Sequence, residues 1–334
     1  MRRAKKDRLL KKYRILIGII FAVVVAIVIG EIFARFYLGL GTPPLSITHP
    51  TIEYMYKPNQ DLYRFGNHFV VNQYGMRSPP FMRTKHNDEL RIMMFGDSVI
   101  NGGSQTDDAD LATSLIRSSL ANSGYQQPIV GNISAGSWGP GNWLAYAKEY
   151  GFFDADIIVL VLSSHDYADN PTFAPLNLNT HPTEQPISAL VEGIERYLPR
   201  YLPRSSSTPI GIENDHPADS VDETGGTKGI TDLQEFLKFA KQHTSNVLVF
   251  QNFEYIEIQK NTPSIGYQRI RAACKQLNIS PISLAPYFRT SLERGVNPYR
   301  DNIHPNQIGQ QIIAKAITVN LPSSNIPSSP IPLR

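Results

Sequence analysis

The stretch IMMFGDSVINGG, residues 92–103, decides the fold. Its first four residues, Ile92 to Phe95, are all apolar, which is typical of a strand buried on both faces. Such strands belong to parallel sheets. The strand ends in Gly-Asp-Ser, and open α/β sheets bind their ligands at the carboxyl ends of the strands. Ser98 therefore lies where we expect a functional residue.

A repeating α/β pattern begins at Leu90 and continues toward the end of the chain. We predict strands at 91–95, 128–134, 156–162, 247–252 and 279–284, and helices near 108–123, 141–151, 231–243, 264–277 and 306–318. Strands that alternate with helices favour a parallel, doubly wound sheet with right-handed crossovers. We assign residues 90–320 to this domain.

One interval, 168–229, is too long for a plain crossover between a strand and a helix. It contains a helix-like stretch, ISALVEGIERYL, and then a polar stretch rich in Gly, Ser and Pro. Two interpretations stay open, an inserted cap with a mobile loop and a disordered surface excursion. Residues 321–334 are rich in Pro and Ser, and we expect them to be unstructured.

The basic residues of the chain concentrate at its N-terminus. Residues 1–14 carry a charge of +7, and because the whole chain carries +3, the remainder carries −4. The folded part therefore gives no electrostatic reason to expect a nucleic-acid partner.

An apolar run of 16 uncharged residues, 15–30, follows the basic tail. As a helix it spans about 24 Å, and it approaches a hydrocarbon core of about 30 Å if it continues to residue 40 with Glu31 and Arg35 at the interface. A secretory signal peptide is the alternative, but no small-x-small cleavage site precedes Thr42. We expect an uncleaved transmembrane anchor over 15–40.

The basic flank places the tail, 1–14, in the cytoplasm and everything after the anchor outside it, which in a bacterium means the periplasm or the outer face. Residues 41–89 then form an extracytoplasmic lead-in, and within it we expect short strands and turns over residues 51–82.

A serine hydroxyl becomes a good nucleophile when a base takes its proton. Of the eight histidines, only His304 has a carboxylate at short spacing just before a predicted helix, in RDNIHPNQIGQQ. Asp301 precedes it by three residues, so one turn brings the carboxylate onto the imidazole, and Pro305 suits the first turn of the helix. We predict Ser98 as nucleophile, His304 as general acid and base, and Asp301 as the group that orients the imidazole. Each residue taken alone has an equally good alternative: Asp301 could be a turn residue without a catalytic role, and His304 could be an ordinary surface histidine.

Besides a nucleophile and a base, such a site requires N–H groups that donate hydrogen bonds to the oxyanion of the transition state. The backbone N–H of Ser98 is one candidate. Gly136, in NISAGSWGPGNW, is a second, because a glycine lets the backbone approach a ligand closely; an ordinary glycine-rich turn is its alternative. A phosphate-binding loop is disfavoured because the Gly-Lys-Ser/Thr ending is missing. We expect Asn101, just after Ser98, to line the pocket.

These motifs resemble the SGNH superfamily of GDSL-type esterases and acyltransferases. The basic anchor, GEIFARF and the lead-in stretch VNQYGMRSPP also resemble the membrane-anchored bacterial members of that family. FGDS resembles the first block of the family and supplies Ser98, NISAGSWG resembles the second and supplies Gly136, and DNIHP resembles the last and supplies Asp301 and His304. The resemblance covers roughly residues 90–318. It implies an SGNH-like (flavodoxin-like) α/β fold, a three-layer doubly wound parallel sheet preceded here by the transmembrane helix.

One position departs from the family pattern. The third block of the family has an asparagine that donates to the oxyanion, and the aligned residue here is His165, followed by Asp166. A neutral imidazole donates one N–H, and Asp166 can bias its tautomer. Either His165 replaces the asparagine as a donor, or it is a structural residue and the pocket has lost that donor.

The resemblance implies a serine ester hydrolase or O-acyltransferase of the cell envelope, acting on acyl esters of carbohydrate or lipid. The alternative is a catalytically impaired SGNH-like module that binds a glycan or a partner protein in an envelope complex. The departure at His165 favours the module, whereas the intact set of Ser98, Asp301 and His304 favours the enzyme.

We expect no metal and no organic cofactor. The single cysteine, Cys274, excludes an intramolecular disulfide and a Cys-rich zinc site, and it is expected to be a buried small hydrophobic residue. His181 and His216 lack metal-ligand spacing. Trp138 and Trp143 either stack on a sugar or pack in the core.

Overall fold

The computed structural model describes residues 2–198 and 223–322. The chain divides into two compact units. In its described part, the larger unit holds residues 44–62, 67–183 and 223–322, and the smaller unit holds residues 2–43, 63–66 and 184–198. Most of the expected mobile loop and nearly all of the expected unstructured tail lie outside the described residues.

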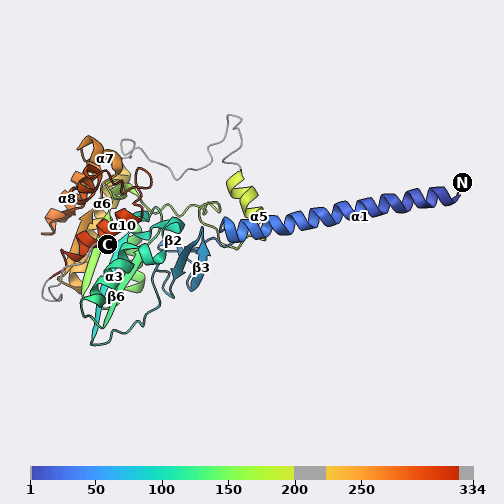
Figure 1. Ribbon diagram of the computed structural model, residues 1–334. Helices are drawn as coiled ribbons and strands as arrows, with labels where there is room; N and C mark the ends of the chain where they lie inside the picture. The colour runs from blue at the N-terminus through green and yellow to red at the C-terminus, as the bar shows by residue number, and fades with distance from the viewer. Residues whose placement is uncertain (1, 199–222, 323–334) are drawn as a thin grey trace. The chain divides into compact units, whose positions relative to one another are not determined.

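The larger unit is built on a five-stranded sheet (Figure 1). Its strands are β5 (Glu89–Gly96), β6 (Gln127–Ser134), β7 (Ile157–Leu162), β8 (Val247–Gln251) and β9 (Ile282–Ser283). Neighbouring strands are parallel, in the order β6-β5-β7-β8-β9. This is the flavodoxin-like order, in which the ligand site lies where the winding reverses beside the first strand. The predicted doubly wound parallel sheet is confirmed.

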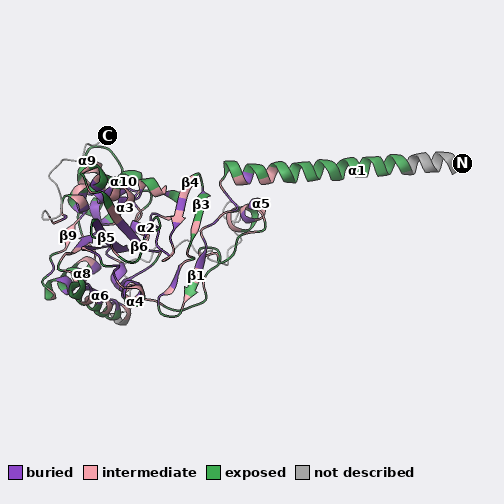
Figure 2. Cartoon of the chain, turned by 90° about the horizontal axis from the view of Figure 1, so that it is seen from below, coloured by how far each residue is buried: buried purple, intermediate pink, exposed green. Residues whose placement is uncertain are grey.

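Helices cover both faces of the sheet and give three layers. Along β5, Ile92 and Met94 pack into one apolar cluster while Met93 and Phe95 pack into the other, as alternation along a strand requires. The second cluster, that of Met93, includes α4 (Pro140–Tyr150), α6 (Glu223–His243) and α8 (Ile265–Gln276). The first includes α3 (Ala112–Asn122), α9 (Ala285–Glu293) and α10 (Gln307–Thr318). Every residue of β5 is buried (Figure 2).

Helix α6 begins at Glu223, eight residues before the predicted start. The added turns contain three glycines, which had favoured a loop. In the structure, a Cβ at Gly229 would collide with the carbonyl of Tyr167, and one at Gly226 would come within 2.7 Å of the Tyr167 ring. The glycines therefore serve a close helix contact, which local propensity does not reveal.

Other boundaries differ for local reasons. The predicted helix at 108–123 is a 3₁₀ turn, Asp108–Asp110, followed by α3, because the Asp107 side chain accepts from the N–H of Ala109 and caps the turn first. Strand β9 has only two residues instead of the predicted six. Three short helices were not predicted, namely α2 (Ser98–Asn101), α7 (Tyr255–Lys260) and α9.

The lead-in consists of two short strand pairs. Strands β1 (Ser46–His49) and β2 (Glu53–Tyr56) are antiparallel, and β3 (Gln60–Arg64) pairs with β4 (Asn67–Val71). The expectation of short strands and turns before the main sheet is met.

The smaller unit begins with α1 (Arg2–Ile32), which continues as a π-helical turn, Phe33–Tyr37. The segment Leu10–Tyr37 is long and apolar enough to cross a membrane. The basic tail is thus the first part of the same helix rather than a separate extension.

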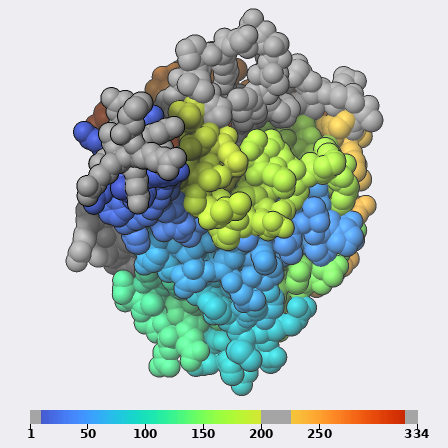
Figure 3. Space-filling view, turned by 90° about the vertical axis from the view of Figure 1, so that its right-hand side faces the viewer, coloured from blue at the N-terminus to red at the C-terminus, as the bar shows by residue number. Residues whose placement is uncertain are grey.

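The end of α1 packs with part of the insertion. The Glu31 carboxylate accepts hydrogen bonds from the backbone N–H groups of Ala189 and Leu190, at 3.0 and 2.9 Å, at the start of α5 (Ala189–Glu192). Buried Glu192 pairs with buried Arg64 at 2.6 Å. The insertion is divided between the units: its residues 168–183 and 223–229 belong to the larger unit, and its residues 184–198 belong with the anchor. Figure 3 shows this yellow-green stretch on the surface.

Candidate active site

Ser98 is the first residue of α2 and lies two residues after the end of β5. The turn is tight, since a Cβ at Gly96 would lie 2.9 Å from both the Ile100 side chain and the Val161 carbonyl. Asp97 caps α2, and its Oδ1 accepts from the N–H of Val99 at 2.9 Å. The glycine and the aspartate of Gly-Asp-Ser thus form the strand-to-helix turn that presents the serine.

Ser98, His304 and Asp301 form a continuous hydrogen-bonded chain. The Nε2 atom of His304 lies 3.0 Å from the Ser98 hydroxyl, and its Nδ1 lies 2.8 Å from Asp301 Oδ2. Asp301 Oδ1 also accepts from the N–H groups of Ile303 and His304. Burial raises the pKa of Asp301, but the hydrogen bonds from the His304 ring and these N–H groups outweigh it and hold the pKa well below its usual range. Asp301 therefore stays ionised and orients the imidazole.

The loop that carries His304 is held by the segment after β8. The Tyr299 hydroxyl donates to the Phe253 carbonyl at 2.6 Å, and the Asn302 amide donates to Glu254 at 3.0 Å. Helix α10 starts at Gln307 with Asn306 as its cap. Pro305 therefore precedes the helix instead of opening it, a correction that follows from the capping side chain of Asn306.

Two backbone N–H groups are candidate oxyanion donors. Gly96 and Ser134 are the last paired residues of β5 and β6, and Ser98 and Gly136 each follow two residues later. Within the described residues, neither N–H donates a hydrogen bond. The Gly136 carbonyl accepts from the Tyr54 hydroxyl, which fixes the peptide.

Asn101 does not have the pocket-lining position expected for it. Its side chain is buried. The amide donates to the Ser134 carbonyl at 3.0 Å and accepts from the Tyr56 hydroxyl at 3.0 Å. The amide is therefore turned into the protein, where it ties α2 to the end of β6.

His165 follows β7, and both of its ring nitrogens face carboxylates. Its Nδ1 lies 3.1 Å from Glu254 Oε1, and its Nε2 lies 3.4 Å from Asp166 Oδ1 and 3.8 Å from Asp97 Oδ2. Burial lowers the pKa of His165, but the charge of Asp166 and the hydrogen bond to Glu254 outweigh it and raise the pKa well above its usual value. This arrangement does not direct an N–H toward an oxyanion, because both ring nitrogens face carboxylates of the protein.

Glu254 is a site residue that sequence reasoning missed. Its carboxylate accepts from Asn302 on the loop of His304 and lies beside His165 at the end of β7. No motif marks it, because it lies 89 positions from His165 and 48 from Asn302.

Arg77, in the lead-in, was also missed. It is fully buried, and it donates to the carbonyls of Asn101, Gly103 and Thr106, which follow Ser98. Its Nε lies 3.0 Å from Asp108. The guanidinium thus holds the loop behind the nucleophile, a role that its five donors suit.

Trp138 and Trp143 pack in the core. Both are buried, and their indole N–H groups donate to the carbonyls of Tyr54 and Gly96 at 3.0 and 2.8 Å. Cys274 is buried in α8 as expected, and burial raises the pKa of its thiol to about 12. His216 lies outside the described residues.

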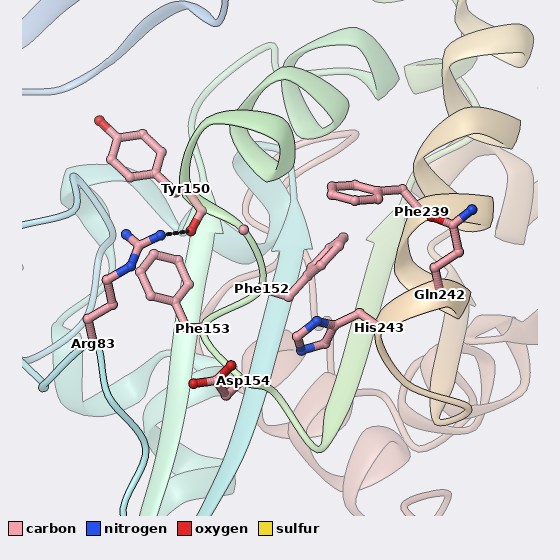
Figure 4. Close-up of a pocket in the computed structure, with 9 residues that line it drawn as sticks. Arg83, Tyr150, Phe152, Phe153, Asp154, Phe239, Gln242 and His243 are labelled. Carbon is pink, nitrogen blue, oxygen red and sulfur yellow. Dashed lines mark hydrogen bonds between the residues drawn. The ribbon is translucent and has the colours of Figure 1, made fainter.

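A pocket of about 290 Å³ opens at the opposite edge of the sheet (Figure 4). Its walls come from the connections that enter β7 and β8 at their amino ends, whereas Ser98 lies at a carboxyl end. Arg83 donates to the Tyr150 carbonyl at 2.8 Å across one wall. The lining residues are Arg83, Tyr150, Gly151, Phe152, Phe153, Asp154, Phe239, Gln242 and His243. This pocket is separate from the Ser98 site.

No protein-family model and no curated protein matches the chain. Solved structures do match. They include a member of the lipolytic G-D-S-L family from Veillonella parvula, 13% identical with a TM-score of 0.41, covering 69% of this chain and 97% of that one. In its motifs the chain resembles the SGNH superfamily, and its sheet has the flavodoxin-like strand order.

Two further matches are of similar quality. A lipase/acylhydrolase from Enterococcus faecalis is 12% identical with a TM-score of 0.43, over 72% of this chain and 100% of that one. A catalytic mutant of an acetylxylan esterase from Geobacillus stearothermophilus is 13% identical with a TM-score of 0.44, over 74% of this chain and 100% of that one.

Proposed function

We propose that this protein is a membrane-anchored serine ester hydrolase or O-acyltransferase. The observation that carries the proposal is the hydrogen-bonded chain from Ser98 through His304 to Asp301. A binding module has no need for such a chain, and this disfavours the alternative of a catalytically impaired glycan- or partner-binding module.

The reaction follows the logic of a Ser-His-Asp triad. His304 Nε2 takes the Ser98 proton as Oγ attacks the acyl carbon, and Asp301 stabilises the imidazolium that forms. The N–H groups of Ser98 and Gly136 stabilise the oxyanion of the tetrahedral intermediate. His304 then returns the proton to the leaving alkoxide, so the alcohol departs and an acyl-enzyme remains on Ser98.

The second half-reaction decides between the two activities. His304 takes a proton from water or from a sugar hydroxyl as that oxygen attacks the acyl carbon of the acyl-enzyme. The bond to Ser98 Oγ then breaks, and His304 returns the proton to Oγ. Water gives an esterase, and a sugar gives an O-acyltransferase. The substrates we propose, acyl esters of envelope glycan or lipid, follow from the family resemblance.

We also propose the topology that the sequence predicts. Residues 1–14 lie in the cytoplasm, residues 15–40 cross the membrane, and the lead-in, 41–89, and the hydrolase domain, 90–320, lie outside. The apolar segment Leu10–Tyr37 and the charge of +7 on residues 1–14 support this orientation.

The test is turnover of an acetyl ester by the full chain in detergent, with and without an added oligosaccharide. We expect wild-type activity that Ser98→Ala abolishes while the thermal unfolding temperature is unchanged. Transfer of label from an acetyl donor to the oligosaccharide identifies the transferase. An active Ser98→Ala protein would refute the proposal.

A further inference from the structure

A cluster of ionisable side chains lies directly behind Ser98 and has no part in the reaction above. Asp97 follows β5, His165 and Asp166 follow β7, and Glu254 follows β8. The three connections meet at the carboxyl edge of the sheet. A buried group of one imidazole and several carboxylates is stable only if its carboxylates take up protons or a positive charge lies among them; burial raises the pKa of both Asp97 and Asp166.

Two of the carboxylates each have one oxygen without a hydrogen-bond partner. Asp97 and Asp166 have exposed fractions of 1% and 0%, and within the described residues Asp97 Oδ2 and Asp166 Oδ1 form no hydrogen bond. The other oxygen of each is held, by the N–H of Val99 at 2.9 Å and by that of Ser163 at 2.7 Å. In each carboxylate, one oxygen is therefore fixed by a backbone N–H, and the other oxygen is available to a ligand.

The free oxygens converge on the Nε2 atom of His165. The separations are 3.4 Å to Asp166 and 3.8 Å to Asp97, and the three donor atoms all lie within 4.8 Å of one another. Charge-assisted hydrogen bonds from nitrogen to a carboxylate are shorter, about 2.7–2.9 Å. Two ligands on a tetrahedral ion with bonds of about 2.0–2.1 Å lie roughly 3.4 Å apart. The separations of 3.4 and 3.8 Å from His165 Nε2 therefore suit a cation shared by the three side chains better than direct hydrogen bonds between the histidine and each aspartate.

The far side of the imidazole supports the same interpretation. His165 Nδ1 lies 3.1 Å from Glu254 Oε1. A histidine that binds a metal nearly always donates its other ring N–H to a carboxylate or a carbonyl, which fixes the tautomer with Nε2 free for the ion. Each of the three ligands thus has one atom facing the centre and another atom held from behind.

We propose that Asp97, His165 and Asp166 bind one divalent cation, with Glu254 orienting the histidine. One nitrogen and two oxygen donors suit Zn²⁺, with solvent completing its coordination. The ion neutralises the two buried aspartates and ties the nucleophile turn to the loop after β7. This site departs from the expectation of no metal, because its ligands come from two segments 68 positions apart and form no sequence motif.

The test measures Zn²⁺ affinity of the full chain in detergent, prepared without a histidine tag and stripped with chelator. Titration against a competing chromophoric chelator gives stoichiometry and affinity without reference to activity. We expect one Zn²⁺ per wild-type chain. His165→Asn, which keeps a side-chain amide, should weaken binding about 100-fold or more, and Glu254→Gln about 10- to 100-fold. The exposed-histidine control, His86→Gln, should bind as the wild type does.

Folding of each variant is checked by its thermal unfolding in the presence of chelator, and Asp166→Asn serves as a second ligand variant should His165→Asn fail to fold. Zn²⁺ should raise the unfolding temperature of the wild type and of His86→Gln but not that of His165→Asn. Equal Zn²⁺ affinity in the wild type and in the folded ligand variant would overturn the proposal, as would the absence of any binding to the wild type. A protonated His165 would then be the cation of the cluster.

Discussion

The imidazole Nε2 of His304 lies 3.0 Å from the hydroxyl of Ser98, although 206 positions separate the two residues. The two are brought together because β5 ends at the turn that presents Ser98, while the segment after β8 holds the loop of His304. The nucleophile and its base therefore depend on different elements, and each can be tested separately.

Asp301→Asn should lower kcat by about 10⁴, because an amide neither fixes the reactive tautomer of His304 nor stabilises its imidazolium. The fold should survive, since an Asn Oδ1 still accepts from the N–H groups of Ile303 and His304. Steady-state kinetics on an aryl acetate, together with thermal unfolding, measure both effects. Asp88→Asn, at an exposed site, is the matched control. Loss of activity through unfolding alone would contradict this role for Asp301.

Arg77→Met should lower the free energy of unfolding by about 3 kcal/mol or more, because Asp108 and three carbonyls lose their buried partner. Arg77→Lys should recover only part of the loss, since one ammonium does not reproduce the fork of donors. Chemical denaturation measures the stability, and kcat reports on the loop behind Ser98. A fully stable and active Arg77→Met protein would show that this clamp is unimportant.

The ion pair of Arg64 and Glu192 should make stability depend on pH. Burial raises the pKa of Glu192, but the hydrogen bonds from Arg64 and from the N–H of Gly41 outweigh it and lower the pKa below the ordinary value of 4.5. The folded state therefore binds fewer protons there than the unfolded state. The stabilisation is complete above pH 4.5 and is lost as the pH falls through the lowered value.

Thermal unfolding from pH 7 to pH 3 measures this contribution by comparison with Glu192→Gln. The variant should be less stable than the wild type at neutral pH, and the difference should shrink in acid. Glu195→Gln, exposed in the same segment, should behave as the wild type does. A difference that is constant with pH would show that the charge of Glu192 is not what stabilises the smaller unit.

Trp143→Phe should lower the free energy of unfolding by at least about 1 kcal/mol, because the donor to the Gly96 carbonyl is lost and the smaller ring leaves a cavity in the core. The KM for an acetylated oligosaccharide should not change, since the indole is buried. Kinetics and denaturation on the same preparation separate the two effects. A raised KM with unchanged stability would instead indicate stacking on a sugar.

Much of the fold could be predicted from local patterns. The central strands are continuous apolar runs, and the Ser98, Asp301 and His304 positions follow from short motifs at a strand end and before a helix. The early start of α6 could not be predicted, because glycines are typical of loops and only the structure shows that Gly226 and Gly229 pack against Tyr167. Glu254 and Arg77 act across long sequence separations, so tertiary structure alone brings them to the site.

The most direct test of the account is covalent labelling of Ser98. The full chain in detergent is treated with a fluorophosphonate at pH 7.5, and the adduct is located by mass spectrometry. We predict labelling at Ser98 that Ser98→Ala removes and His304→Ala strongly reduces, with both variants folded by thermal unfolding. A folded wild-type protein that is not labelled, or labelling of Ser98 at the same rate in His304→Ala, would contradict an activated serine at this site.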